Sequence, residues 1–171
     1  KNSSTPLWSY ETDNHAVSVA ISSDGEYIAV GNRDEKVYLF DKDSSTPLWS
    51  YDTGSYMYSI AISADGEYIA AGSNDYKVYL FDKDSSTPIW SYSTGQQIDT
   101  LDISANGEYV VAGGEKVYLF AKDSSTPLWS YEADDNIITV SISSDGEYVV
   151  VGSSDDKAYL FEKDSSTPLW S

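Results

Sequence analysis

The sequence predicts an all-β fold, a β-propeller arc of four four-stranded antiparallel blades of about 41 residues each. Three observations predict it. A heptapeptide, Ser-Ser-Thr-Pro-Leu/Ile-Trp-Ser, starts at residues 3, 44, 85, 124 and 165, so one unit is written four times with a heptapeptide at each end. Each unit holds four short apolar runs, as a propeller blade does. No window shows an apolar period of 3.6 residues, so we expect no helix of consequence.

The first unit illustrates each element in order. Residues 17–22 alternate large and small side chains, and this period of two indicates a strand. Asp24-Gly25 follows as a tight turn, because glycine readily adopts the positive φ that such a turn requires. A polar loop at 32–35 and a turn at 42–47 separate the later strands. These strands are residues 27–30, 37–40 and 48–51.

The side chains indicate where each strand lies in a blade. Both faces of the third strand are apolar, with Val37 and Leu39 on one face and Tyr38 and Phe40 on the other, so its sheet must lie between two others. Small residues on the first strand suit the taper towards a propeller axis. Proline before the fourth strand suits an outer edge, where a missing N–H costs no ladder bond. A four-stranded superbarrel or a β-sandwich is the alternative, but neither predicts so strict a period.

We expect a single repeat domain spanning residues 1–171. Its parts are an N-terminal outer strand at 5–10 and blades at 16–51, 57–92, 98–131 and 137–171.

Composition excludes several classes of function. The chain has 28 acidic and 10 basic residues, a net charge of -18, so it cannot neutralise the phosphates of a nucleic acid and would be repelled by an anionic membrane. Without cysteine there are no disulfides or thiolate metal sites. Solubility explains the acidity, with a high-salt habitat or a cationic partner as alternatives. The compartment is undetermined, although the composition is compatible with a secreted or cell-surface protein.

Two propeller families resemble the repeat. The pattern Asp-Gly-Glu-Tyr, followed by a small residue with glycine and by an aspartate before the third strand, resembles WD-repeat proteins. However, the Gly-His pair is absent, and Phe-Asp, Phe-Ala or Phe-Glu replaces Trp-Asp, so the hydrogen-bonded tetrad of that family is not expected. Those aspartates are Asp34, Asp75 and Asp155.

Val-Tyr-Leu-Phe-Asp-Lys followed by Leu-Trp-Ser-Tyr is more similar to the quinoprotein-type, pyrroloquinoline-quinone-like propeller repeats. That resemblance implies a ring that usually has eight blades, in which a tryptophan on each outer strand docks against the adjacent blade. The residues of the quinone site are not found, so no cofactor is expected. The tryptophans that would dock are Trp49, Trp90 and Trp129, with Trp8 and Trp170 at the termini.

The repeats contain four copies of the first three strands but five copies of the fourth, so one outer strand is surplus. An open half-ring would also expose an apolar blade face at each end. We therefore expect two chains to form an eight-bladed, two-fold ring, in which Tyr10–Glu11 of one chain completes the last blade of the other. Salt should strengthen this dimer, because both chains are acidic. A self-closed four-bladed ring and a fragment of a longer array are the alternatives.

Differences among the four copies collect in two loop types, which an up-and-down blade places on the same face of the disc. The functional interpretation is a ligand- or protein-binding face on a constant scaffold, and the alternative is drift in water-exposed loops. The candidate residues of this face are His15, Arg33, Tyr56, Tyr58, Gln96, Gln97, Asp99 and Asn136.

The sequence gives only weak indications of metal binding or catalysis. Residues 41–45 space oxygens like the opening of a calcium loop, but the central glycine and closing glutamate are missing and Ala121 removes the first ligand in the third copy. The single histidine, His15, has no evident nucleophile partner. We therefore expect no metal and no enzyme activity.

The sequence thus predicts a non-enzymatic scaffold or binding module that assembles with itself. One alternative is an engineered or fragmentary repeat protein with no activity beyond folding and assembly, since the copies are nearly identical. Another is the propeller portion of a quinoprotein-like enzyme.

Overall fold

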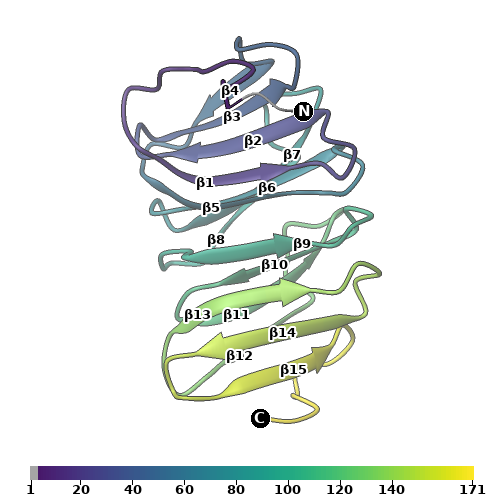
Figure 1. Ribbon diagram of the computed structural model, residues 1–171. Coiled ribbons are helices and arrows are strands. Elements are labelled where there is room, and N and C mark those ends of the chain that lie inside the picture. The colour runs from purple at the N-terminus through teal and green to yellow at the C-terminus, as the bar shows by residue number, and fades with distance from the viewer. Residues whose placement is uncertain (1–3) are drawn as a thin grey trace.

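A computed structural model describes residues 4–171, so Ser3, which opens the first heptapeptide copy, lies outside the described residues. Fifteen strands form four antiparallel sheets, and the described residues contain no helix, hence none that could cross a membrane (Figure 1). In each sheet the strands pair in chain order. The predicted all-β fold of repeated antiparallel blades is therefore confirmed.

Each sheet is one blade, and we number the blades in chain order. Blade 1 contains β1 (Ala16–Ile21), β2 (Tyr27–Asn32), β3 (Lys36–Asp41) and β4 (Trp49–Asp52). Blade 2 contains β5 (Met57–Ile62), β6 (Tyr68–Ser73), β7 (Lys77–Asp82) and β8 (Trp90–Ser93). Blade 3 contains β9 (Thr100–Ile103), β10 (Tyr109–Gly113), β11 (Lys116–Ala121) and β12 (Trp129–Glu132). Blade 4 contains β13 (Ile137–Ile142), β14 (Tyr148–Ser153) and β15 (Ala158–Glu162).

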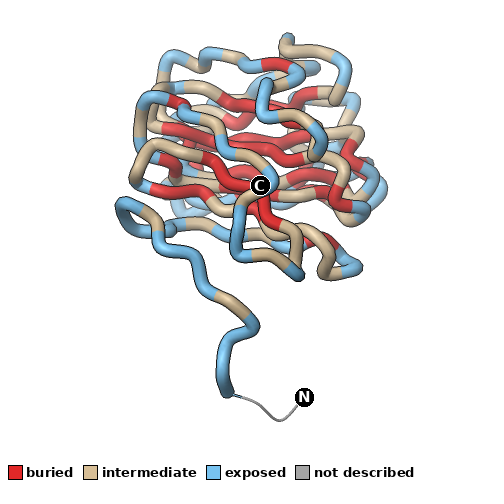
Figure 2. The backbone as a smooth tube through the Cα atoms, turned by 90° about the horizontal axis from the view of Figure 1, so that it is seen from above, coloured by how far each residue is buried: buried red, intermediate tan, exposed pale blue. Residues whose placement is uncertain are grey.

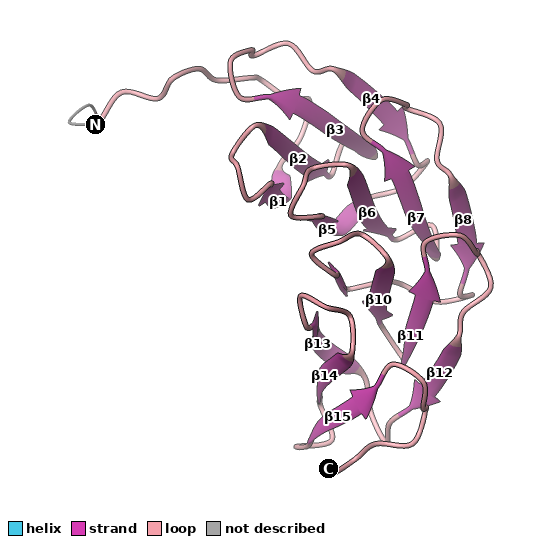
Figure 3. Cartoon of the chain, turned by 90° about the vertical axis from the view of Figure 1, so that its right-hand side faces the viewer, coloured by secondary structure: helices cyan, strands magenta, loops and turns pink. Residues whose placement is uncertain are grey.

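The blades follow one another along an open arc (Figure 3). In Figure 3, β1, β5 and β13 lie on the inner side of the arc, and β4, β8 and β12 lie on the outer side. β1 packs against β5, β5 against β9 and β9 against β13. Blades 1 and 4 stand at opposite ends of the arc, so the self-closed four-bladed ring is not what this structure adopts.

The ends of the chain differ from the sequence prediction. The predicted outer strand at residues 5–10 is not formed in the described structure, because β4 already occupies the outer edge of blade 1. Blade 4 has three strands, and its predicted fourth strand is reduced to a single bridge between Leu160 and Trp170. Blade 3 begins its first strand at Thr100 rather than at residue 98, opposite the shortened connection at 114–115.

The core lies between the blades. Three apolar clusters occupy the three junctions, and each combines residues from two neighbouring sheets. Figure 2 shows the buried residues concentrated in the sheets and the exposed ones in the loops and the N-terminal segment. At the first junction, Val37 and Leu39 of blade 1 meet Tyr79 and Phe81 of blade 2, and all four are at most 2% exposed. The third strands β7 and β11 are therefore buried on both faces because a blade packs on each side, whereas the second face of β3 is covered by Trp8 and Tyr10 of the N-terminal segment.

The turn between the first and second strands also joins neighbouring blades. Gly25, Gly66, Gly107 and Gly146 all have positive φ, between 71° and 77°. The last three also accommodate a tyrosine from the preceding blade. A Cβ atom on Gly107, for example, would lie 2.3 Å from Cδ2 of Tyr68. Glycine is thus required twice here, by the backbone and by the ring above it.

We expect Gly107→Ala to destabilise the fold more than Gly54→Ala. Both glycines have positive φ, which costs alanine about 1–2 kcal/mol. Only Gly107 faces a ring, since nothing lies within 4 Å of a Cβ on Gly54. Crowding at Gly107 should add about 1–3 kcal/mol. Urea denaturation of both variants measures the difference, and equal losses would contradict the close tyrosine contact.

Candidate functional site

The two variable loop types lie together on one face of the arc. Arg33 N donates to His15 O at 3.0 Å, and Asn74 N donates to Tyr56 O at 2.8 Å. In blade 4, Ser154 N donates to the Asn136 carbonyl at 2.8 Å. Each bond joins the loop after a second strand to the loop before a first strand, so we call this surface the variable-loop face.

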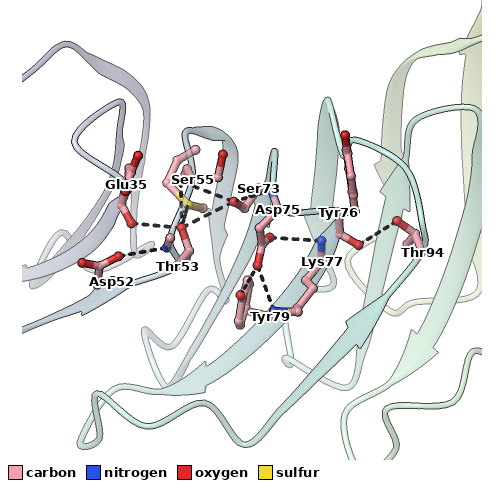
Figure 4. A network of polar contacts seen from close by, with 12 residues as sticks. Glu35, Asp52, Thr53, Ser55, Ser73, Asp75, Tyr76, Lys77, Tyr79 and Thr94 are labelled. Atoms are coloured by element: carbon pink, nitrogen blue, oxygen red, sulfur yellow. Dashed lines mark hydrogen bonds and ion pairs between the residues drawn. The ribbon is translucent and has the colours of Figure 1, made fainter.

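A threonine network supports this face between blades 1 and 2 (Figure 4). Thr53 Oγ1 donates to the carbonyls of Glu35 and Ser55 at 2.9 and 2.8 Å, and the Thr53 N–H also donates to Glu35 O. Thr94 repeats the contact with Tyr76 in the next blade. Glu35 and Tyr76 have positive φ, which is uncommon outside glycine, so the threonine bonds secure a loop conformation that the residue type disfavours.

An aspartate–tyrosine pair stands beneath the loop in three blades. The hydroxyls of Tyr38, Tyr79 and Tyr159 donate to Asp34, Asp75 and Asp155 at 2.5–2.6 Å. The hydrogen bond from Tyr159 lowers the pKa of Asp155 below its ordinary value and raises the pKa of Tyr159 to about 12. Burial is the larger cause of the raised pKa of Tyr38 and Tyr79. The aspartates that resembled the WD-repeat pattern therefore anchor loops within their own blade.

The predicted contact residues fall into separate groups. His15 and Arg33 are exposed on blade 1, where backbone and Asn14 bonds hold their loops together. Tyr56, 45% exposed, and the half-buried Tyr58 belong to blade 2. These four residues come from blades 1 and 2, and none of them lines the hollow between blades 3 and 4 described next.

A polar hollow of about 230 Å³ brings three predicted residues together, Gln97, Asp99 and Asn136. Glu115 completes its lining. The amide of Gln97 donates to Asp99, and the neighbouring Gln96 amide donates to Glu115. The hollow therefore combines amides and carboxylates from blades 3 and 4.

Glu115 is absent from the sequence-predicted set. The signal for it was the connection at residues 114–115, which is two residues shorter than its counterparts. A Cβ on Gly114 would lie 2.1 Å from Gln97 O, so the short connection runs directly against the facing loop and brings Glu115 to the hollow.

The outer-strand tryptophans dock as the family resemblance implies. In each case the indole Nε1 donates at 2.7 Å to a lysine carbonyl of the next blade. The ring also packs on a phenylalanine there, as Trp49 does on Phe81 at 5.3 Å. Trp8 docks on blade 1 although its own segment forms no strand, whereas Trp170 is 52% exposed and docks on no described blade. The indole–carbonyl pairs are Trp8–Lys42, Trp49–Lys83, Trp90–Lys122 and Trp129–Lys163.

The calcium-like loop uses its oxygens internally. Asp41 Oδ1 accepts the N–H of Asp43 at 2.8 Å, and Ser44 Oγ accepts the N–H of Thr46 at 3.0 Å. Across residues 4–171, no three His, Cys, Asp or Glu side chains are grouped as metal ligands. This segment is a hairpin loop closed by its own side chains.

Comparison with known families agrees with this geometry. Residues 1–120 and 33–171 match a family model described as outer membrane protein assembly factor BamB, of the PQQ-like type. The chain belongs to this BamB/PQQ-like family. No curated protein matches the sequence. The predicted similarity to PQQ-like repeats is thereby confirmed over the whole chain.

The BamB/PQQ-like arc presents two open blade faces, which we call the back face of blade 1 and the front face of blade 4. Val19 on the back face is 68% exposed, whereas its counterparts in the other blades, Ile60, Leu101 and Val140, are 6–7% exposed. On the front face Val150 is 41% exposed. Residues that a neighbouring blade buries elsewhere in the arc are thus left uncovered at both ends.

We expect Trp49→Phe to lower the free energy of unfolding by about 1–2 kcal/mol, because the partly buried Lys83 carbonyl loses its indole donor. Trp170→Phe is the matched control, and its effect should stay within about 0.5 kcal/mol for an exposed ring. Urea denaturation followed by circular dichroism compares the two. Equal losses would show that docking does not support the junction.

We expect Tyr159→Phe to raise the pKa of Asp155 towards its ordinary value of 3.8, because the variant loses the hydroxyl donor. A lowered folded-state pKa contributes stability above pH 3.8 that is lost as pH falls through the folded-state value, so the variant should lose less stability on acidification. Carbon NMR of the Asp155 carboxylate measures the shift. Tyr118→Phe is the control, since blade 3 has no aspartate at this loop position; an unchanged pKa of Asp155 in Tyr159→Phe would contradict the assignment.

Proposed function

We propose that the chain is a non-enzymatic scaffold that completes a propeller ring with a second copy of itself, and that its variable-loop face contacts a ligand or protein. The observation that carries the proposal is the relation between the two open faces. The front face of blade 4 and the back face of blade 1 are repeats of the two halves of a junction that the chain already builds three times.

The apolar residues of the open faces support this pairing position by position. On the front face, Val150 repeats Ala29, Ala70 and Val111, all of which are fully buried inside the arc. On the back face, Val19 and Ile21 are 68% and 62% exposed, although their counterparts are buried or half-buried. Monomers seldom leave contiguous apolar surface uncovered, and a second copy supplies a face of matching shape.

Polar groups give the junction a register. Ser18 Oγ accepts the N–H of Ile60 at 3.1 Å, and Ser59 and Thr100 accept equivalent N–H groups of the following blade. Thr139 holds the same position in blade 4, and its Oγ1 would accept a hydrogen bond from the N–H of Val19 of the second copy. The ring we propose therefore extends an existing ladder of bonds between inner strands.

The N-terminal segment is the strand that we expect to complete blade 4 of the second copy. In blades 1 to 3 a third-strand lysine faces a residue of the outer strand, and in blade 3 this pair, Lys116 and Glu132, forms an ion pair at 2.7 Å. Lys157 is the corresponding lysine of blade 4, and Glu11 the corresponding outer residue of the N-terminal segment. Trp8 is already docked on blade 1, so the segment would need only to displace the single bridge between Leu160 and Trp170 and form its own hydrogen bonds to β15.

Two properties define the scaffold role further. The BamB/PQQ-like model is described as an assembly factor, which agrees with a protein that works by holding other molecules. The differences among blades meet on the variable-loop face, where Gln97, Asp99, Glu115 and Asn136 line one hollow. This face would be displayed twice in a two-fold ring, and it is the surface we assign to ligand or protein contact.

A double-cysteine variant tests the ring. Glu11→Cys with Lys157→Cys places one cysteine at each end of a chain that has none of its own. We expect oxidation to join two chains through two disulfides, and light scattering of the wild type to give twice the mass of one chain. The mass should shift further towards the dimer as salt rises, because net charge -18 on each chain opposes association.

Lys116→Cys with Glu132→Cys is the matched control, because these residues face each other within blade 3 and should form an intramolecular disulfide. A ladder of oligomers from the test variant would indicate an open array, and a cross-linked monomer a self-closed ring; either result would overturn the proposal. A wild-type monomer at tens of micromolar would do the same. A dimer without the disulfide would overturn only the assignment of the N-terminal strand.

A further inference from the structure

A cavity of about 520 Å³ lies on the back face of blade 1. It opens between the turn at Gly25 and the docked ring of Trp8, and Ile21, Ile28 and Lys42 contribute to its walls. Its lining is mainly apolar, and its two charged members are Asp24 and Lys42. A cavity of this kind can accommodate an aromatic side chain.

The same position is filled at every junction inside the arc. Tyr27 lies over Gly66, Tyr68 over Gly107, and Tyr109 over Gly146. A Cβ on these glycines would approach the tyrosine rings to 2.6, 2.3 and 2.4 Å. Gly25 is the fourth member of the set, and no tyrosine covers it, since its nearest neighbour is Ile21 Cδ1 at 4.0 Å.

Lys42, which lines the cavity, has equivalent lysines at the junctions inside the arc. Nζ of Lys122 stands 4.9 Å from the ring centroid of Tyr68, and Nζ of Lys163 stands 5.7 Å from that of Tyr109. Lys42 is the equivalent lysine of blade 1 and already binds Glu26 at 2.6 Å. The cavity therefore repeats a socket made of a glycine floor, a lysine that faces the ring, and a docked tryptophan.

A tyrosine that covers no glycine lies at the other end of the arc. Tyr148 occupies the position of Tyr27, Tyr68 and Tyr109 in blade 4, where no following blade covers it, and it is 47% exposed. Backbone hydrogen bonds also join the first hairpin turns of neighbouring blades. Ser23 N donates to Ala64 O, and Ala64 N donates to Ala105 O, each in the next blade. This series continues through Ala105 N to Ser144 O, four residues before Tyr148.

We infer that the cavity is a tyrosine-binding socket and that its occupant is Tyr148 of a second copy. The inference rests on the ring proposed above and adds the contact that sets its register. Tyr148 of the second copy would cover Gly25 and face Lys42, and Ser144 N of that same copy would donate to Ser23 O beside the cavity. Each ring contains two junctions between copies, with one such contact at each, so the association depends on this contact twice.

Sedimentation equilibrium of four variants tests the socket. Tyr148→Ala removes the ring, and Gly25→Val fills the floor. We expect each to weaken dimerisation roughly 30-fold for each junction, as loss of a central aromatic anchor does. Tyr56→Ala and Gly54→Val are the matched controls: Tyr56 is similarly exposed but lies on the variable-loop face, and Gly54 has positive φ with open space around it. Both should change the dissociation constant less than threefold.

A fifth variant, Tyr148→Phe, should dimerise like the wild type, because the socket recognises the ring; a loss equal to that of Tyr148→Ala would overturn this form of recognition. Circular dichroism of each variant checks that the blades remain folded, and the pair of primary variants keeps the test decisive if one does not. A wild-type dimer that neither primary variant weakens would overturn the socket and leave the ring standing. A wild-type monomer would overturn both.

Discussion

The structure depends on one interaction, the packing of an apolar sheet face against the next sheet. A single blade is apolar on both faces and cannot bury either by itself, so its stability requires a neighbour. Three such junctions hold the arc, and each repeats the same contacts: a valine and a leucine of one third strand against a tyrosine and a phenylalanine of the next. Because the contact is directional, with a front face and a back face, it can propagate around an axis but cannot terminate without leaving one face of each kind exposed.

Polar groups convert this packing into a unique register. Apolar faces alone would allow blades to slide, whereas three sets of bonds cross every junction at different radii. The turn backbones connect successive blades at the corner of the first hairpin, serine or threonine hydroxyls connect the inner strands, and the tryptophan indoles connect the outer strands to lysine carbonyls. The tyrosine–glycine contact belongs to the same corner as the turn bonds. A junction with a second copy would have to satisfy all of them together, which makes it selective for the chain itself.

The repeat explains why the constant and variable parts of the sequence are separated in space. The connection from third to fourth strand and the hairpin turn take part in every junction, so their residues are determined by packing and hydrogen bonding. The other two connections contact mainly each other, through backbone bonds and the threonine network, and their outward side chains are free to differ. A binding surface can therefore diversify there without loss of the scaffold.

The sequence by itself determined the period, the strands, the turn glycines, the sandwiched third strand and the docking tryptophans, because each follows from local pattern or from identity between copies. It also indicated Gln97, Asp99 and Asn136, but not that Glu115 joins them, since that depends on how a connection shortened by two residues meets the facing loop. Only the tertiary structure decided that four blades form an open arc, because closure depends on the angle between blades rather than on any one of them. It likewise showed that Tyr148 is uncovered at one end of the arc and that no tyrosine covers Gly25 at the other, since the places of residues 123 positions apart depend on how the blades are arranged around an axis.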